Sequence, residues 1–230
     1  MTQLLAQSRL KTFDIPHKGL RNLLSQVTLL AGATDFTDKA QISRLHQLGR
    51  DLFFLLSEHA HDENTVMLAA LNQRQPGAGD HNEAEHEIIE KQQAELEEML
   101  ETLVAKAQNG EEVDHLAERF YFDMNRFQSG YLLHMLEEEE ETQRLLWKHF
   151  SDAELIEMRK QIIGRMAPAT LLQWFRFAAP YMGHAARLQW LRPVKAAVPP
   201  PFFSQIMETL EVVLTGAEFK RLQAELGGGQ

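Results

Sequence analysis

The sequence predicts an all-α protein: an antiparallel up-down four-helix bundle over residues 1–150, and a C-terminal helical extension over residues 151–230 that packs on the bundle. Two observations predict this fold class. Glycine and proline gather at a few places, and the stretches between them are rich in Leu, Glu, Gln, Arg and Ala. Apolar residues in those stretches recur every three or four positions, which is typical of helices.

The first half of the bundle is expected to hold two helices. The first covers about residues 14–31, because Asp14 can cap it and Pro16 stands at a permitted early position. The second covers about residues 37–73 and ends before the proline- and glycine-rich run 75–79. Proline and glycine, which helix interiors disfavour, thus mark the start of the first helix and the end of the second.

The second half of the bundle is expected to hold two further helices. The third covers about residues 80–108 and ends at an Asn-Gly turn. The fourth covers about residues 111–150. It ends where Ser151 and Glu154 form a capping-box pattern that starts a new helix.

Residues 151–230 differ in kind from the bundle. They hold six of the eight prolines, and their net charge is +2, against −12 for residues 1–150. Short, angled helices are therefore expected near residues 152–165, 169–190, 202–213 and 216–226. The aromatic side chains of this segment either fill a core or form a surface for a protein partner or for a homodimer.

Composition excludes several kinds of function. The 230 residues include no cysteine, so any metal must be held by nitrogen and oxygen. The net charge of −10 argues against nucleic-acid binding. No apolar run approaches the roughly 20 residues of a membrane span. The start, MTQLLAQSRLK, lacks the apolar stretch of a signal peptide, so we expect a cytoplasmic protein with no membrane partner.

One histidine from each of the four expected helices lies at the same level. In an up-down bundle, residues equally far from a turn share a height. His86 and His134 lie 24 positions on either side of Gly110. His59 and His86 lie at about equal distances from the turn near Pro76. His17 and His59 lie at equal distances from the connection at residues 37–38. A single layer of histidines is therefore predicted.

These four histidines are expected to point into the core, because each shares a helical face with apolar residues. Two of them form the expected pair with a glutamate one turn later, His59 with Glu63 and His134 with Glu138, and His86 with Glu90 also fits the spacing. Within the run 137–141 only Glu138 is expected to face inward. The remaining histidines that the pattern places at the surface or around the site are His46, His81, His115, His149 and His184.

Four imidazoles and two carboxylates in a dry core would cost several kcal/mol per unpaired ion. Bound cations remove that cost, and this donor set suits a pair of first-row transition ions, with iron or manganese ahead of zinc. About four ligands for each ion leave positions open for water, oxygen or nitric oxide. The predicted metal ligands are His17, His59, Glu63, His86, His134 and Glu138.

A ferritin-like di-iron bundle is the competing arrangement, with a glutamate from each of two helices and Glu-x-x-His from each of the other two. Glu58 with His61, and Glu83 with His86, have that spacing. However, residues 1–50 contain no glutamate, so the first helix cannot supply its carboxylate. The histidine-rich arrangement fits better.

The six predicted ligands, in their order along the chain, resemble the pattern of the hemerythrin-like, or HHE cation-binding, family over about residues 10–150. The family pattern is a lone histidine early in the first helix, His-x-x-x-Glu on the second, a histidine on the third and His-x-x-x-Glu/Asp on the fourth. The matching segments are FDIPHKGLR around His17, EHAHDE from Glu58 to Glu63, EHEII around His86 and HMLEE from His134 to Glu138.

The resemblance implies a non-haem di-iron centre bridged by Glu63 and Glu138. It assigns His17 and His59 to one iron and His86 and His134 to the other. Oxygen-carrying hemerythrins have two histidines four apart on the third helix, but here the positions four before and four after His86 are Asn82 and Glu90. One iron then lacks its third imidazole unless His61, His81 or Glu90 replaces it, which argues against simple oxygen carriage.

Three kinds of function follow. The first is binding of oxygen or nitric oxide, in sensing, in oxidative or nitrosative stress or in iron handling. The second is an enzyme: a di-iron oxidoreductase that consumes peroxide or nitric oxide, or an iron donor for the repair of iron–sulfur centres. The third is a regulatory module whose tail recognises a partner. Tyr131, one turn before His134, is either a hydrogen-bond donor to the diatomic ligand or an aromatic residue of the core.

Overall fold

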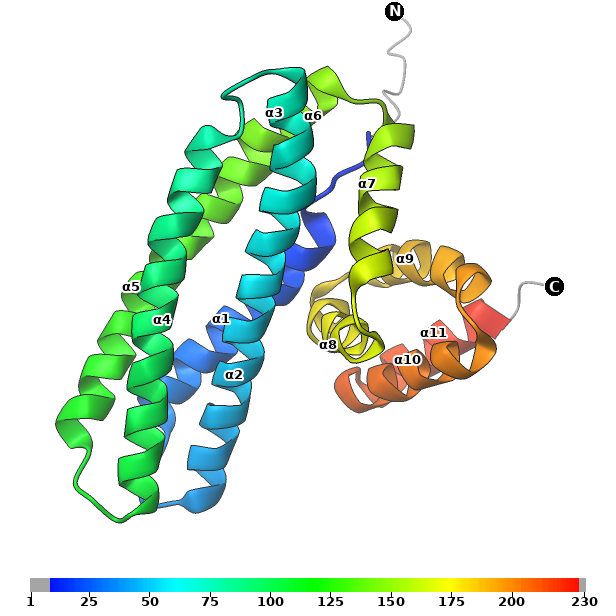
Figure 1. Ribbon diagram of the computed structural model, residues 1–230. Coiled ribbons are helices and arrows are strands. Elements are labelled where there is room, and N and C mark those ends of the chain that lie inside the picture. Colours follow the sequence, from blue (N-terminus) through cyan, green and yellow to red (C-terminus); the bar gives the residue numbers. More distant parts are fainter. Residues whose placement is uncertain (1–8, 228–230) are drawn as a thin grey trace, which may run out of the picture. The chain divides into compact units, whose positions relative to one another are not determined.

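The computed structural model describes residues 9–227, and every regular element within that range is helical (Figure 1). The all-α class is therefore confirmed. The first eight residues of the predicted bundle and the last three of the predicted extension lie outside the described residues. By its contacts the chain divides into two units. The first unit holds residues 26–165 with the segment that ends at Asp14, and the second holds residues 15–25 and 166–230.

The first two helices begin close to where the sequence predicts. Helix α1 runs over Asp14–Ala33, with Asp14 as its first residue rather than its cap. Helix α2 runs over Lys39–Asp62. Asp38 caps α2, since its Oδ1 accepts a hydrogen bond of 2.8 Å from the backbone N–H of Ala40.

Both helices that carry a His-x-x-x-Glu pair change to π-helix part of the way along. Helix α2 passes into the π-helix η1 (Glu63–Leu68) and then α3 (Ala69–Arg74). Helix α5 (Asp114–Glu137) passes into the π-helix η2 (Glu138–Thr142) and then α6 (Gln143–His149). The sequence predicted two uninterrupted α-helices here, because apolar periodicity does not reveal a local change in the hydrogen-bond pattern.

Helix α4 covers Asp80–Gln108, the limits that the sequence predicts. The connections on either side of α4 turn at glycines with positive φ, 83° at Gly77 and 74° at Gly110, a region that other residues rarely adopt. Helix α4 packs against both α2 and α5 and runs in the opposite direction to each of them (Figure 1).

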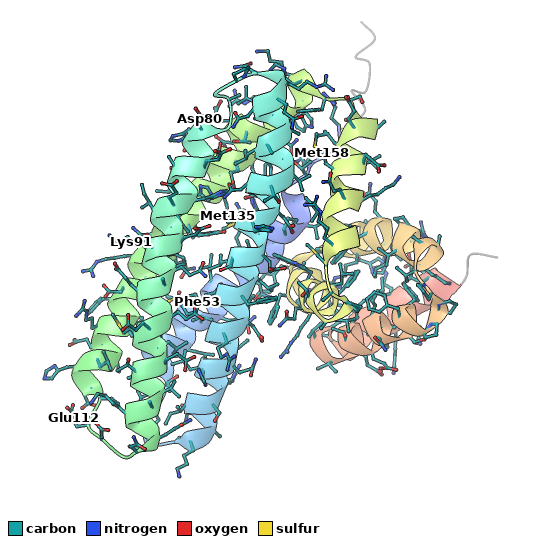
Figure 2. All side chains as sticks on the ribbon, viewed as in Figure 1. Phe53, Asp80, Lys91, Glu112, Met135 and Met158 are labelled. Carbon is teal, nitrogen blue, oxygen red and sulfur yellow. The ribbon has the colours of Figure 1, made fainter. Side chains whose placement is uncertain are left out.

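The first unit buries apolar side chains between these helices. Phe53 of α2 and Met135 of α5 are buried, whereas Lys91 of α4 is exposed (Figure 2). Gly49 of α2 allows Leu100 of α4 to approach closely, because a Cβ at Gly49 would lie 2.3 Å from Leu100 Cδ2. A second buried cluster includes Phe13, which directly precedes α1, and five residues from later in the chain: Met67, Leu71, Leu146, Phe150 and Leu155.

Helix α7 (Asp152–Arg165) begins at the predicted capping box. The Ser151 backbone N–H donates to Glu154 Oε2 at 2.8 Å, and the Glu154 backbone N–H donates to Ser151 Oγ at 3.4 Å. Helix α7 belongs to the first unit by its contacts. The expected limit between bundle and extension at residue 150 stays a prediction.

Within residues 166–227 the second unit contains four further α-helices: α8 (Pro168–Ala178), α9 (His184–Ala197), α10 (Pro200–Val213) and α11 (Gly216–Gly227). The prediction of one helix over residues 169–190 was wrong. A 3-10 turn at Ala179–Tyr181 and then Gly183 separate α8 from α9, because Pro180 lacks the amide hydrogen that would continue the helix. These helices share a core of their own that includes Phe175, Leu191, Ile206, Leu210 and Leu222.

Within residues 9–227, no helix combines the length and the apolar character that crossing a membrane would require.

Candidate metal centre

The structure gathers the six side chains that the sequence proposes as ligands. All are at most 5% exposed: His17, His59, Glu63, His86, His134 and Glu138. They form two groups, in each of which one donor atom per residue lies within 4.8 Å of the others. The first group is His17, His59, Glu63 and Glu138, and the second is His86, His134 and Glu138. Glu138 belongs to both groups, so they share a carboxylate.

Glu63 also faces both groups. Its Oε1 lies 3.0 Å from His59 Nε2, and its Oε2 lies 3.4 Å from His86 Nε2. The two oxygens of one carboxylate thus approach imidazoles from two different helices, α2 and α4.

In the second group, three donor atoms converge. Glu138 Oε1 lies 3.3 Å from His134 Nε2 and 3.5 Å from His86 Nε2. The two imidazole Nε2 atoms are only 3.1 Å apart. At that distance two bare lone pairs would repel, so a proton or another cation has to lie between them.

The outer nitrogen of each of these imidazoles is held by a polar partner. His86 Nδ1 lies 2.7 Å from Asn64 Oδ1, and His134 Nδ1 lies 2.9 Å from Glu85 Oε2. Both oxygens can only accept, so each Nδ1 carries the hydrogen and each Nε2 is left to face the centre. Histidines that bind metals in proteins are oriented by contacts of this kind.

Sequence reasoning missed Asn64 and Glu85. Each directly adjoins a predicted ligand, Asn64 after Glu63 and Glu85 before His86. The signal that could have found them is this adjacency, but residues next to each other on a helix point in different directions, so adjacency alone does not show that a side chain faces the site. Only the folded positions of α4 and η1 show that these two face a neighbouring helix.

The buried carboxylates favour positive charge in the site. Burial is the largest single influence on His86 and opposes its protonation. The carboxylates of Glu138 and Glu63 nevertheless raise the pKa of His86 to about 10. The buried carboxylates therefore bring positive charge into the centre, and a metal ion can take the place of that proton.

Both π-helices begin at the two shared glutamates. Segment η1 starts at Glu63, four residues after His59, and η2 starts at Glu138, four residues after His134. Single π-helical turns inside α-helices occur frequently at functional sites. The repeat of the same change at both glutamates links this backbone feature to the site rather than to either helix alone.

Tyr131 lies beside the second group. Its ring packs edge-on to that of His134, with centroids 5.6 Å apart, and the side chain is 3% exposed. Burial, and then the negative charges of Glu63 and Glu138, raise the pKa of Tyr131 well above its usual value. The hydroxyl therefore keeps its proton and is able to donate a hydrogen bond.

The three residues considered as replacements for a third imidazole, His61, His81 and Glu90, are all exposed. Asn82, one turn before His86, is buried, and its Oδ1 accepts a 3.0 Å hydrogen bond from Thr142 Oγ1. The other histidines are not buried, and three of them pair with a glutamate or glutamine at the surface: His46, His149 and His184.

Helices that bring buried histidines and glutamates together define an all-helical cation-binding protein. A family model described as the hemerythrin HHE cation binding domain matches residues 9–146. The match spans more than half of the chain, and the protein belongs to this family. No curated protein and no solved structure matched the chain. Together, the family and the buried histidine and glutamate group indicate a metal-binding site.

Proposed function

We propose that the centre holds two iron ions and binds oxygen or nitric oxide, in sensing, in stress protection or in iron handling. The observation that carries this proposal is the sharing of carboxylates. Glu63 presents one oxygen to His59 and the other to His86, and Glu138 belongs to both groups of donor atoms. Two shared carboxylates between two pairs of imidazoles suit two cations better than one.

His17 and His59 would hold one ion, and His86 and His134 the other, with Glu63 and Glu138 between them. Two imidazoles and two carboxylate oxygens are nitrogen and oxygen donors that suit iron. Four protein ligands are fewer than iron commonly accepts, so iron bound here would supply open positions at which a diatomic ligand binds reversibly.

The surroundings of His86 favour sensing or iron handling over oxygen carriage. The residues four before and four after it are Asn82 and Glu90, and Glu90 is exposed. Among the residues that the structure describes, the second group therefore has two imidazoles and no third. A site with fewer imidazoles holds its ion less firmly and exchanges it more readily, which suits a protein that responds to iron or to its ligand.

Tyr131 would act from the side of the pocket. Because its hydroxyl stays protonated beside Glu63 and Glu138, it can donate a hydrogen bond to a diatomic ligand held in the second group. Removing that donor should weaken ligand binding without removing a metal ligand.

We further propose that α1, α2, α4 and α5, with the segments that continue α2 and α5, form the up-down four-helix bundle of the family. The opposite directions of consecutive helices in the first unit support this arrangement (Figure 1). Residues 151–230 would then serve as the extension that recognises a protein partner or a second copy of the chain.

The visible spectrum of the iron-loaded protein tests the proposed function. The spectrum is recorded first under argon and then after oxygen or nitric oxide is added. We expect the added gas to produce a new absorption band that disappears on degassing. Tyr131→Phe should bind the same ligand about fivefold more weakly, because one hydrogen bond contributes about 1 kcal/mol. Steady consumption of peroxide or nitric oxide, with no reversible band, would show that the protein is an enzyme instead.

A further inference from the structure

We propose a second, exposed metal site beside the buried centre, formed by His81, Glu85 and Glu137. This surface trio binds a divalent first-row transition ion and passes it to the buried centre. The binding step stands on the trio's own geometry. The transfer step rests on the proposed function, because it needs a buried centre that takes up metal.

The three side chains come from two helices and meet at the surface. His81 and Glu85 lie one turn apart on α4, and Glu137 is the last residue of α5. His81 Nε2 lies 2.8 Å from Glu137 Oε1 and 3.8 Å from Glu85 Oε1. One donor atom from each residue lies within 4.8 Å of the other two. Their side chains are 65%, 30% and 40% exposed in the order His81, Glu85, Glu137, so an ion from solvent can reach them.

The donor set suits a transition ion that exchanges with solvent. One imidazole nitrogen and two carboxylate oxygens are ligands that zinc, iron(II) and manganese(II) accept. Three protein ligands leave the remaining positions to water, which is typical of a site that releases its ion. A divalent cation would also neutralise the two carboxylates, which approach the same imidazole nitrogen from different helices.

The trio is connected to the buried centre through Glu85. While Glu85 Oε1 faces His81, its Oε2 accepts the 2.9 Å hydrogen bond from His134 Nδ1. Glu85 therefore connects the trio to His134, whose Nε2 lies 3.3 Å from the buried Glu138 Oε1. Both carboxylates of the trio also adjoin buried ligands in the chain, Glu85 before His86 and Glu137 before Glu138.

The protein contains a matched control for a histidine that merely pairs with a glutamate. His46 Nε2 lies 2.8 Å from Glu101 Oε1, the same distance as between His81 and Glu137. Within residues 9–227, His46 is not part of any group of three donor residues. A metal site at the trio should therefore depend on His81 and not on His46.

Zinc titration of the iron-loaded full chain by calorimetry tests the binding step. The wild type and His46→Ala should bind one further zinc per chain, and His81→Ala and Glu137→Gln should lose that binding while they keep their iron. Since His81 is exposed, its removal should not unfold the chain. Equal zinc binding by the wild type and His81→Ala would overturn the proposed site, as would loss of the same binding in His46→Ala.

Exchange of added iron-57 into the iron-loaded protein, followed by mass spectrometry, tests the transfer step. Exchange should be several-fold slower in His81→Ala than in His46→Ala, and equal rates would overturn transfer through the trio. Zinc titration of Glu63→Gln separates this site from the buried one. Glu63→Gln should still bind one zinc at the trio, because Glu63 is not part of it. If the wild type proves to hold no iron but both proteins bind this zinc, the proposed function fails and the exposed site stands.

Discussion

Two imidazoles of the centre are oriented by residues that lie outside the two buried groups of donor atoms. Asn64 accepts from His86 and Glu85 accepts from His134, and these contacts leave each Nε2 facing the shared carboxylates. A free imidazole carries its hydrogen on either nitrogen, so an unoriented histidine spends part of its time in the form that cannot bind metal. The buried groups therefore work as donors because of their neighbours.

Asn64→Ala should lower the affinity for iron about 10- to 100-fold, the range found when contacts that orient a metal-binding histidine are removed. Competition with a chelator of known affinity measures the change. Asn125→Ala is the matched control, because Asn125 is on α5 and its side-chain amide donates a hydrogen bond to the backbone carbonyl of Tyr121. Equal affinity in the two variants would mean that Asn64 does not orient His86.

Among the elements, α2 and α5 each place a histidine and a glutamate one turn apart and then change to π-helix at the glutamate. Helix α4 lies against both, so its own position decides how closely the two groups approach. The contact of Gly49 with Leu100 sets the separation of α2 and α4 at one point along them.

Gly49→Ala should destabilise the protein by about 1–3 kcal/mol, because its Cβ would require Leu100 and the surrounding core to move. Gly130→Ala should instead stabilise it by about 0.5–1 kcal/mol, since Gly130 lies within α5 with open space around it. Urea unfolding followed by circular dichroism measures both. If Gly49→Ala were as stable as Gly130→Ala, the close approach of α2 and α4 would be refuted.

Much of this arrangement could be predicted from the sequence. Apolar periodicity and the Gly and Pro positions predicted the limits of α4 and α7 to the residue. Equal distances from the turns placed His86 and His134 at one level, and the structure brings their Nε2 atoms together. These features depend on the spacing of residues along helices, which the sequence contains in full.

The parts that could not be predicted depend on contacts between helices. The π-helices at Glu63 and Glu138 leave no trace in the apolar pattern. The break between α8 and α9 was missed although Pro180 lies at it, because a proline inside a helix is sometimes tolerated, as Pro193 is inside α9. Asn64 and Glu85 gain their roles only from side chains on a neighbouring helix.

At the level of the whole molecule, each unit has its own core, and the second unit is held together at a buried arginine. Arg187 donates through Nε to the carbonyl of Ala179 at 2.7 Å, where α8 ends. Its Nη1 lies 2.8 Å from Glu218 Oε1, at the start of α11. The Arg187 side chain thus connects the C-terminal end of α8 with the start of α11.

The stability of the second unit should depend on pH through Glu218. Hydrogen bonds from Thr215 and then from Arg187 lower the pKa of Glu218 to about 2. Because its pKa is lower in the folded chain, its ionised form stabilises the fold above the unfolded pKa of 4.5, and this contribution is lost as the pH falls towards 2.

Glu218→Gln should therefore be less stable than the wild type at pH 7, by about 1 kcal/mol or less because the glutamate is partly exposed. Urea unfolding of both proteins at pH 7 and pH 2.5 measures the difference. The two proteins should approach equal stability at the lower pH. A difference that stays constant between the two pH values would show that the charge of Glu218 contributes nothing.

The ratio of iron to protein in the purified chain and in Glu138→Gln decides whether two ions share the buried carboxylates. Glu138 is in both groups of donor atoms, so its loss should release both ions. We expect two irons per wild-type chain and almost none in Glu138→Gln, while Glu90→Gln keeps two. A wild-type chain with a single iron, or a Glu138→Gln variant that keeps its full iron content, would contradict a shared di-iron centre.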